Sequence, residues 1–238
     1  MNIHVLTRKE EIEEAQLVRG SKIAVAVDVL LATTTIAACL EKGAVQVIPA
    51  ATREEALEHA ASLPADSYIL AGEEQARPIE GFVYPGPVHL AAGAQGKTVI
   101  LVTTNGTAAL RKLQSAEEVY AGSLVNARAL AFVLAAKPEE ATLLITAAGN
   151  AGEISLEDMY GAGCLIDAVL KEKTCTLTDA ARTALSVYQN EPNARHVLES
   201  SRVGKKLLAY NMEEDLEYAS TVNSSTAVCR YINTGISN

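Results

Sequence analysis

The segment from Ile23 to Ile36 constrains the fold of this chain more than any other. It opens with five apolar residues, ends that run at Asp28, and passes through three threonines into a helical pattern that stops at Gly43. This arrangement predicts a buried strand, a polar turn and a helix. In an open α/β sheet, ligands bind at this end of the strands, beside helix N-termini. A strand followed by an N-capping threonine is the purely structural alternative.

Short β-branched runs alternate with amphipathic runs along the rest of the chain. Strands are expected over residues 3–6, 23–27, 45–48, 68–70, 98–102, 118–120 and 142–146. Helices are expected over residues 10–18, 35–41, 53–61, 107–113, 126–134, 156–170, 179–189 and 194–199. This alternation predicts a three-layer α/β/α fold with a largely parallel sheet.

The organisation of the chain is interpreted as one α/β domain over residues 1–238, with a helical elaboration from about residue 155. The stretch over residues 77–93 is rich in glycine and proline, so it is expected to be a surface loop or lid. No internal repeat or linker divides the sequence.

Composition narrows the class of partner. The net charge is −9 and no basic stripe is present, which argues against nucleic acid and anionic membranes. A small anion remains compatible, because helix N-termini and a bound cation reverse the charge locally. The spacing of Cys39, Cys164, Cys175 and Cys229 fits neither zinc nor a redox pair. Buried thiols and the absence of a signal-peptide pattern predict a cytoplasmic location.

A second threonine-rich turn follows the apolar run at residues 99–102. Its members are Thr103, Thr104, Asn105, Gly106 and Thr107. Asn-Gly favours a tight turn, and Thr107 can cap the helix that follows. An ordinary strand-to-helix turn is the alternative. Two polar turns at one sheet edge predict a cradle for phosphate or sulfonate.

Carboxylates stand at two further points of the same kind. Glu73 and Glu74 end the strand expected at residues 68–70, and Glu157 and Asp158 open the helix expected at residues 156–170. Acidic residues in a first helical turn often only complement the helix dipole, so spacing alone leaves their role open. Asp215 is a weaker candidate.

Several common catalytic patterns are absent from the sequence. No H-x-x-H or H-E-x-x-H spacing suggests zinc, and no G-x-S-x-G, phosphate-loop or dinucleotide fingerprint occurs. Asp28 invites comparison with phosphatases of the haloacid dehalogenase type, but Leu30 stands where their D-x-D pair needs a second aspartate.

The run D-V-L-x-A-T-T-T-I over residues 28–36 resembles the opening signature of the ComB family of Mg²⁺-dependent 2-phosphosulfolactate phosphatases. Similar blocks follow in the same order over roughly residues 3–220. They are Gly72-Glu73, Gly81-Phe82, residues 103–107, residues 122–127, Ala148-Gly149, residues 156–158, Ala162-Gly163, Ser201-x-x-Gly204 and Asp215.

The resemblance implies a Mg²⁺-dependent hydrolysis of 2-phosphosulfolactate to 3-sulfolactate and phosphate. It implies catalytic roles for Asp28, Glu73 and Asp158, with Mg²⁺ held by these carboxylates and Glu157. The substrate-binding residues it implies are Thr33, Thr34, Thr35, Thr104, Asn105, Gly106, Thr107 and Asn126. The expected partner is a small anionic phosphoester, and a homodimer is left open.

The chain also departs from the family pattern at two positions where arginine is usual. Leu31 and Glu74 stand there, and the loop after Phe82 differs as well. An arginine fork binds oxyanions in a way that neither residue replaces. Arg77, Arg128 or Arg202 are candidates to compensate. The alternative function is therefore a diverged member that binds a small anion as a sensor or partner subunit.

Overall fold

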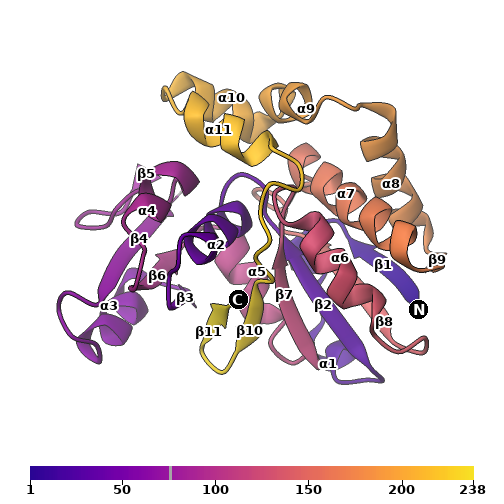
Figure 1. The fold of residues 1–238 in the computed structure, drawn as a ribbon, viewed down its shortest axis with the longest axis horizontal. Coiled ribbons are helices and arrows are strands. Elements are labelled where there is room, and N and C mark those ends of the chain that lie inside the picture. Colours follow the sequence, from indigo (N-terminus) through magenta and orange to yellow (C-terminus); the bar gives the residue numbers. More distant parts are fainter. Residues whose placement is uncertain (75–76) are drawn as a thin grey trace.

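The structure is a computed structural model that describes residues 1–74 and 77–238. Within that part of the chain, a mixed sheet of eleven strands has the order β5-β4-β6-β3-β11-β10-β7-β2-β8-β1-β9 (Figure 1). The strands are β1 (Asn2–Leu6), β2 (Lys22–Val27), β3 (Gln46–Ala50), β4 (Tyr68–Glu74), β5 (Arg77–Pro78), β6 (Thr98–Val102), β7 (Glu118–Gly122), β8 (Thr142–Ala147), β9 (Thr176–Leu177), β10 (Arg230–Ile232) and β11 (Gly235–Ser237).

Helices lie on both faces of this sheet. They are the 3-10 turn η1 (Lys9–Glu11) and α1 (Glu14–Leu17), α2 (Ala32–Glu41), α3 (Arg53–Ala61), α4 (Pro87–Ala92), α5 (Gly106–Lys112), α6 (Ala127–Ala135), α7 (Leu156–Glu172), α8 (Asp179–Asn190), α9 (Ala194–Ser200), α10 (Arg202–Ala209) and α11 (Glu213–Ser220). The predicted α/β fold with a largely parallel sheet is confirmed.

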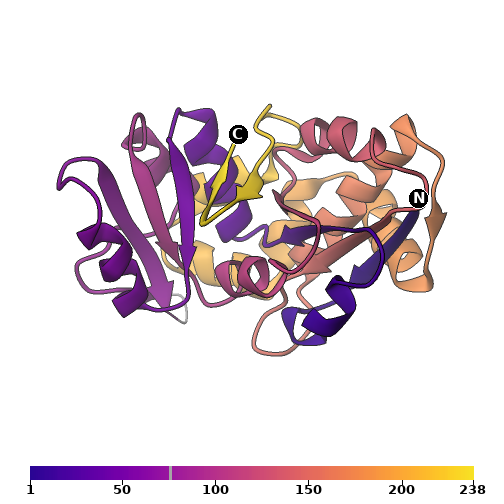
Figure 2. The ribbon, with the colours of Figure 1, turned by 90° about the horizontal axis from the view of Figure 1, so that it is seen from below.

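The sheet consists of two parallel parts with a hairpin between them. One part contains β4, β6 and β3, and the other contains β7, β2, β8, β1 and β9. The antiparallel hairpin β10–β11 pairs with β3 through Ile236 and Val47, and with β7 through Arg230 and Tyr120. Figure 2 shows the yellow C-terminal hairpin lodged between the two parts. The end of the chain thus completes the middle of the sheet.

Strand β2 illustrates why the sequence forms a buried sheet. Ile23, Val25 and Val27 belong to the apolar core that includes α6, α7 and α8. Ala24 and Ala26 point to the other face and join the core that includes α2 and α5. Both faces of the strand are therefore buried, which is why the sequence reads as a continuous apolar run rather than as an alternation.

The C-terminal region is mostly helical from α7 onward, as expected. Helices α9, α10 and α11 form a layer at the end of the molecule where α2 and α7 begin (Figure 1). Asp215 on α11 joins this layer to α4, because its Oδ1 accepts the N–H of Val88 at 3.1 Å. The interpretation of residues 1–238 as one domain stays a prediction.

Two expectations about local structure are wrong. Residues 77–93 are not a continuous loop, since they contain β5 and the helix α4, whose Leu90 and Ala91 are buried in the core with α2. Residues 10–18 do not form one helix. They divide into η1 and α1 because Ile12 and Glu13 have extended backbone angles. The sequence pattern also missed α10, α11 and the short strands β5, β9, β10 and β11.

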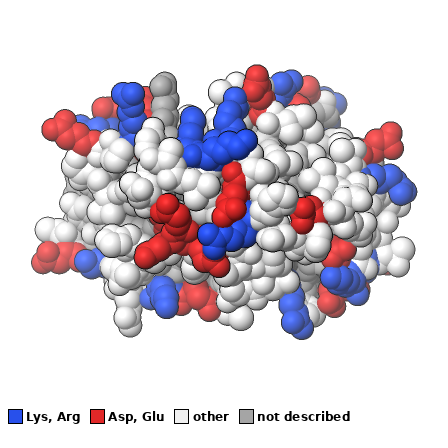
Figure 3. Space-filling view, turned by 90° about the horizontal axis from the view of Figure 1, so that it is seen from above, with Lys and Arg blue, Asp and Glu red and all other residues white. Residues whose placement is uncertain are grey.

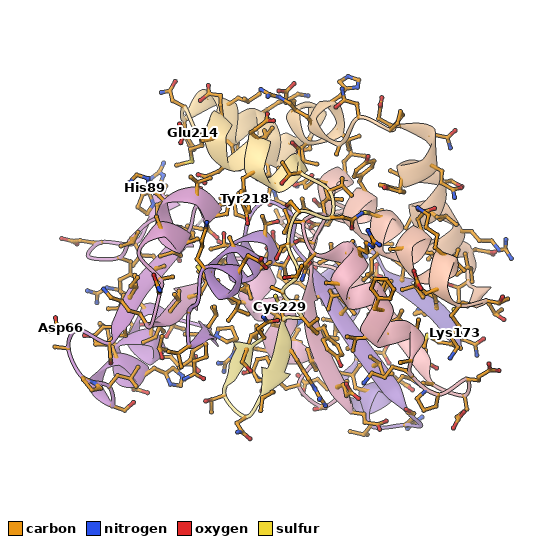
Figure 4. All side chains as sticks on the ribbon, viewed as in Figure 1. Asp66, His89, Lys173, Glu214, Tyr218 and Cys229 are labelled. Atoms are coloured by element: carbon orange, nitrogen blue, oxygen red, sulfur yellow. The ribbon has the colours of Figure 1, made fainter. Side chains whose placement is uncertain are left out.

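Three of the four cysteines are buried, as expected for small apolar side chains. Cys39 and Cys229 lie in the core and Cys164 lies in α7, whereas Cys175 is half-buried. Cys229 lies near the middle of the molecule, where the chain enters the hairpin (Figure 4). Burial raises the pKa of Cys39 and of Cys164 to about 12, so neither thiol ionises near neutral pH.

Among the helices of residues 1–74 and 77–238, none combines the length and the apolar character needed to cross a bilayer.

Candidate active site

Asp28 lies at the carboxyl end of β2, where two helices begin. Its carboxylate accepts the backbone N–H of Ala32 and of Gly106, the first residues of α2 and α5. The side chain is 7 % exposed. A Cβ atom at position 106 would lie 2.6 Å from Asp28 Oδ2 and 2.4 Å from the Cβ of Ala32, so only glycine fits there. Gly106 of the Asn-Gly turn therefore allows the turn before α5 to pack closely against the turn before α2.

Asp158 ties two loops of the same edge together. Its Oδ1 accepts the N–H of Val29 at 2.9 Å, and its Oδ2 accepts the N–H of Gly149 at 3.1 Å. Asp158 is 3 % exposed and lies in the first turn of α7. It thereby fixes the turn after β2 against the loop after β8.

Glu157 precedes Asp158 and has a different environment. It is also 3 % exposed, yet no hydrogen bond or ion pair is found for its carboxylate among the described residues. Its charge acts on both Asp28 and Asp158. Glu157 is thus a buried carboxylate whose oxygens remain available.

Glu73 reaches the site from the other part of the sheet. It lies in β4, and its carboxylate accepts the N–H of Thr104 at 2.7 Å and the hydroxyl of Thr104 at 3.2 Å. Its charge also acts on Asp28. The structure therefore places near one another the four carboxylates that the sequence put at two strand ends and one helix start.

The electrostatics of the cluster follow from burying like charges together. Burial, with the charges of Glu73 and Glu157, raises the pKa of Asp28 to about 7. Burial and the charges of Asp28 and Glu157 raise the pKa of Asp158 well above its ordinary value. A proton or a cation at this point would relieve the repulsion.

The donor set can be compared with the needs of Mg²⁺. Among residues 1–74 and 77–238, no three or more His, Cys, Asp or Glu side chains converge closely enough to form a ready metal cage. Mg²⁺ does not require one, because it usually takes one or two carboxylates, several waters and phosphate oxygens. Asp28, Asp158 and Glu73 already accept two hydrogen bonds each. Glu157, with no hydrogen bond found among the described residues, therefore has the most accessible oxygens for the ion, and Asp28 is the carboxylate on which its charge acts.

The threonine hydroxyls of the two turns are used within the fold. Thr33 donates to the carbonyl of Asp28 at 2.7 Å, Thr34 to that of Val29 at 2.9 Å and Thr35 to that of Pro85 at 2.6 Å. Thr107 donates to the carbonyl of Thr103 at 2.8 Å. A hydroxyl has one proton to donate, so in this arrangement these four side chains shape the turns instead of offering a proton to a phosphate.

The side chain of Asn126, like the threonine hydroxyls, makes its hydrogen bonds within the fold. Its amide donates to the carbonyls of Ala121 and Ala227, and its oxygen accepts the N–H of Ser123 at 2.9 Å. It is fully buried and holds the segment before the C-terminal hairpin against the end of β7. These contacts leave Asn126 no direct path to a ligand.

Two cations at this edge were not predicted. Lys9 Nζ donates to Asn105 Oδ1 at 2.7 Å, and Arg8 Nη1 donates to the carbonyl of Gly152 at 2.8 Å. Both residues follow β1, which pairs with β8, and β8 in turn pairs with β2, the strand that ends at Asp28. The rule that parallel strands end at one edge would have indicated them, since the strand at residues 3–6 was expected.

The arginines proposed as compensating residues differ in position. Arg128 lies over Phe132 on α6, and Arg77 is exposed on β5. Arg202 donates to the carbonyl of Asn150 at 2.7 Å and to Glu153 at 3.0 Å, beside the loop that leads to Glu157. Leu31 is buried in the apolar core with α7, so its position is not on a polar wall.

The face seen from above in Figure 1 carries charges of both signs. Figure 3 shows Lys and Arg side chains gathered at the middle of one rim of this face, with Asp and Glu side chains beside them. Positive and negative side chains are therefore gathered in different places on this face.

Comparisons with known proteins agree with this geometry. The sequence model of the family described as 2-phosphosulpholactate phosphatase matches residues 6–234. A protein of Clostridium perfringens is 35% identical over 98% of this chain and 94% of its own length. A protein of Clostridium acetobutylicum is 31% identical over 98% of both chains.

A third relative, from Deinococcus radiodurans, is 36% identical over 87% of this chain and 86% of its own. All three relatives are named "Probable 2-phosphosulfolactate phosphatase". The match of the family model covers nearly the whole sequence, including every carboxylate of the site. The chain belongs to the 2-phosphosulfolactate phosphatase family.

Proposed function

We propose that this chain hydrolyses the phosphate ester of 2-phosphosulfolactate and releases 3-sulfolactate and phosphate. Membership of the family and the names of its relatives support phosphatase activity. The observation that carries the proposal is the position of Asp28, which lies at the N-termini of α2 and α5 near Glu157, a buried carboxylate with no hydrogen bond in the described part of the chain. Such a position places a carboxylate next to backbone donors at a ligand-binding edge.

We also propose Mg²⁺ as the cofactor, with Asp28 and Glu157 as the residues that would hold it. The ion would neutralise phosphoryl oxygens and stabilise the departing alkoxide. The observation that supports it is chemical, since two buried carboxylates whose charges act on each other, one of them with no hydrogen bond among the described residues, match the hard oxygen ligands that Mg²⁺ prefers.

The remaining residues position and charge the site. Asp158 holds the turn after β2 in place through Val29 and Gly149, and Glu73 holds the second turn through Thr104. Lys9, next to Asn105, supplies positive charge for the oxygens of a phosphate. In the metal-free protein the pKa of Asp28 is raised to about 7 by burial and by the neighbouring carboxylates, and a cation at this point would relieve that repulsion. Catalysis is then largely a matter of positioning.

One observation favours the second candidate, a family member that binds a small anion without efficient turnover. Leu31 lies in the apolar core and Glu74 is an exposed carboxylate, so neither position supplies the usual arginine. The site would then hold a dianionic phosphate less tightly than an arginine fork does.

The test is phosphate release from 2-phosphosulfolactate with Mg²⁺, compared with the same mixture plus chelator. Turnover that depends on the metal supports the phosphatase. Equal release with and without chelator would contradict the role of Mg²⁺, and binding without release would support the second candidate. The cytoplasmic location, the homodimer and the lack of nucleic-acid binding stay predictions.

A further inference from the structure

A small cavity adjoins the site on the side of Glu157. It has a volume of about 220 Å³ and lies between the loop after β8, the first turn of α7 and the corner between α9 and α10. Its walls include Ser155, Glu157, Ser201 and Arg202. Two of the motifs in the sequence, residues 156–158 and Ser201-x-x-Gly204, therefore meet in one place, and of its lining residues the proposed reaction uses Glu157 alone.

The helix that opens into this cavity lacks a side-chain cap. Ser155 is the N-cap residue of α7, but its hydroxyl accepts no hydrogen bond from the first turn. The residue is 5 % exposed, and its Oγ has no partner among the described residues. By contrast, Ser201 caps α10 by accepting the N–H of Gly204 at 2.9 Å. A buried, unpartnered hydroxyl beside an uncapped helix N-terminus is an arrangement that accepts an anion.

Arg202 provides a cation on the same wall. Its guanidinium donates to the carbonyl of Asn150 and to Glu153, and it has further N–H groups. Both partners of the ion pair with Glu153 are exposed to solvent, the Arg202 side chain at 50% and the Glu153 side chain at 71%. Such pairs are weak in water, so an incoming oxyanion can take the place of the Glu153 carboxylate.

Glu157 connects the cavity to the carboxylate cluster. It lines the cavity and its charge acts on Asp28. A ligand with an acid group between Ser155 and Arg202 would therefore extend its other end past Glu157 toward Asp28. The Glu157 carboxylate repels that acid group unless a cation neutralises the Glu157 charge. The groups that donate hydrogen bonds to the anion therefore lie on the side of Ser155 and Arg202.

We propose that this cavity binds the acid group of the substrate that is not hydrolysed, a sulfonate, through Arg202, the Ser155 hydroxyl and the N-terminus of α7. The proposal rests on the proposed function, since it names the part of the substrate that selects it. A sulfonate has three oxygens that accept hydrogen bonds in a tetrahedral arrangement. The guanidinium fork, a hydroxyl and backbone N–H groups approach from different directions, which suits that shape.

The first experiment measures binding without chemistry. Calorimetry with 3-sulfolactate, isethionate (a sulfonate without a carboxylate) and lactate (a carboxylate without a sulfonate) is done on the wild type, Arg202→Gln, Ser155→Ala and Lys205→Gln. Lys205 is exposed on the same helix as Arg202, so its variant controls for the lost charge. We expect Arg202→Gln to weaken 3-sulfolactate and isethionate binding about ten- to hundredfold. Ser155→Ala should weaken both about tenfold, and Lys205→Gln less than about twofold.

The second experiment measures hydrolysis of 2-phosphosulfolactate and of 2-phospholactate, which lacks the sulfonate. In Arg202→Gln, the KM for the sulfonated ester should rise about ten- to hundredfold, whereas kcat and the KM for 2-phospholactate should change little. A role of Arg202 in folding alone would lower activity on both esters equally.

The outcomes separate this proposal from the proposed function. Sulfonate binding that depends on Arg202 in a wild type that hydrolyses nothing would support the cavity and refute the reaction. Hydrolysis with unchanged kinetics in Arg202→Gln would support the reaction and overturn the cavity. Equal effects of Arg202→Gln and Lys205→Gln, or lactate binding as tight as isethionate binding, would also overturn it.

Discussion

The two parallel parts of the sheet contribute to the site in different ways. The part with β7, β2, β8 and β1 supplies Asp28, Glu157 and Asp158, all of them at most 7 % exposed. The part with β4, β6 and β3 supplies Glu73, which is half-buried, and Thr104, which is exposed. Strand β2 pairs along six residues with β8 and along five with β7. The first part thus supplies the buried carboxylates at the end of a well-paired strand. The second part supplies a more accessible hydrogen-bonded pair, Glu73 and Thr104, that faces them.

This difference shows where the electrostatic repulsion within the site is concentrated. Like charges are packed together only where strands on both sides hold the backbone, and the structure offsets their repulsion with backbone N–H groups at Asp28 and Asp158. The two parts are joined by the crossovers through α2 and α5, whose first residues both contact Asp28. Changes at this junction should therefore have the largest effects.

The largest effect is expected for Asp28→Asn. The amide keeps the shape of the side chain but loses the charge that would hold Mg²⁺, so kcat for 2-phosphosulfolactate should fall at least about a thousandfold. Phosphate release under saturating Mg²⁺ measures this, and circular dichroism checks that the fold is kept. Near wild-type turnover would contradict the central role of the buried part of the site.

The junction itself is tested by Gly106→Ala. The added Cβ would clash with Asp28 and with Ala32, so the free energy of unfolding should fall by about 2–4 kcal/mol and activity should be lost with it. Gly93→Ala is the matched control, because its Cβ would meet nothing closer than 3.7 Å. Urea unfolding measures both variants. Equal stability of the two would show that the turns are not packed as described.

The pH dependence of stability tests the charge cluster without activity. The pKa of Asp28 is raised from 3.8 to about 7, so the folded state binds the extra proton between these values. The contribution of Asp28 to stability is therefore present below about pH 4 and is lost as the pH rises through 7. In metal-free protein, Asp28→Asn should gain about 2–3 kcal/mol on the wild type between pH 5 and pH 8. A difference that does not change with pH would refute the raised pKa.

A smaller effect is expected from the accessible part of the site. Glu73→Gln removes a like charge near Asp28, so in metal-free protein the pKa of Asp28 should fall and the pH profile of stability should shift to lower pH. The hydrogen bonds to Thr104 are retained in part by the amide, so kcat should fall only about tenfold. A profile that moves to higher pH would contradict the electrostatic coupling of the two parts.

The smallest effect on activity is expected at Glu74, one of the two positions where the family resemblance implies an arginine; the other, Leu31, tests stability instead. Glu74 is exposed on β4, so Glu74→Arg should lower KM for the phosphoester by only about two- to tenfold. Leu31→Arg would bury a charge in the apolar core with α7 and should destabilise the fold by several kcal/mol. Steady-state kinetics and thermal unfolding separate the two outcomes.

The pattern of apolar runs predicted most of the parallel sheet. The strand expected at residues 98–102 agrees with β6 at every residue, and the helix expected at residues 53–61 agrees with α3 in the same way. Both succeed because the periodicity and the end signals of these elements are present in the local sequence. The hairpin β10–β11 was missed, since strands of three residues carry too little periodicity to be recognised. Helix α4 was missed because Gly and Pro around it indicate a loop unless the burial of Leu90 and Ala91 is known.

For the site, the sequence by itself placed Asp28, Glu73, Glu157 and Asp158 at strand ends and helix starts, and their convergence follows from the parallel sheet. Only the tertiary structure decided what each does there. In it, the oxygens of Asp158 accept two backbone N–H groups, Glu157 has no hydrogen bond among the residues that the structure describes, and the hydroxyls of Thr33, Thr34 and Thr35 donate within the fold. It also brought Lys9 and Arg202 to the edge. Hydrogen-bond partners far apart in sequence depend on distances that no local pattern encodes, so residue type and spacing predict a location but not a role.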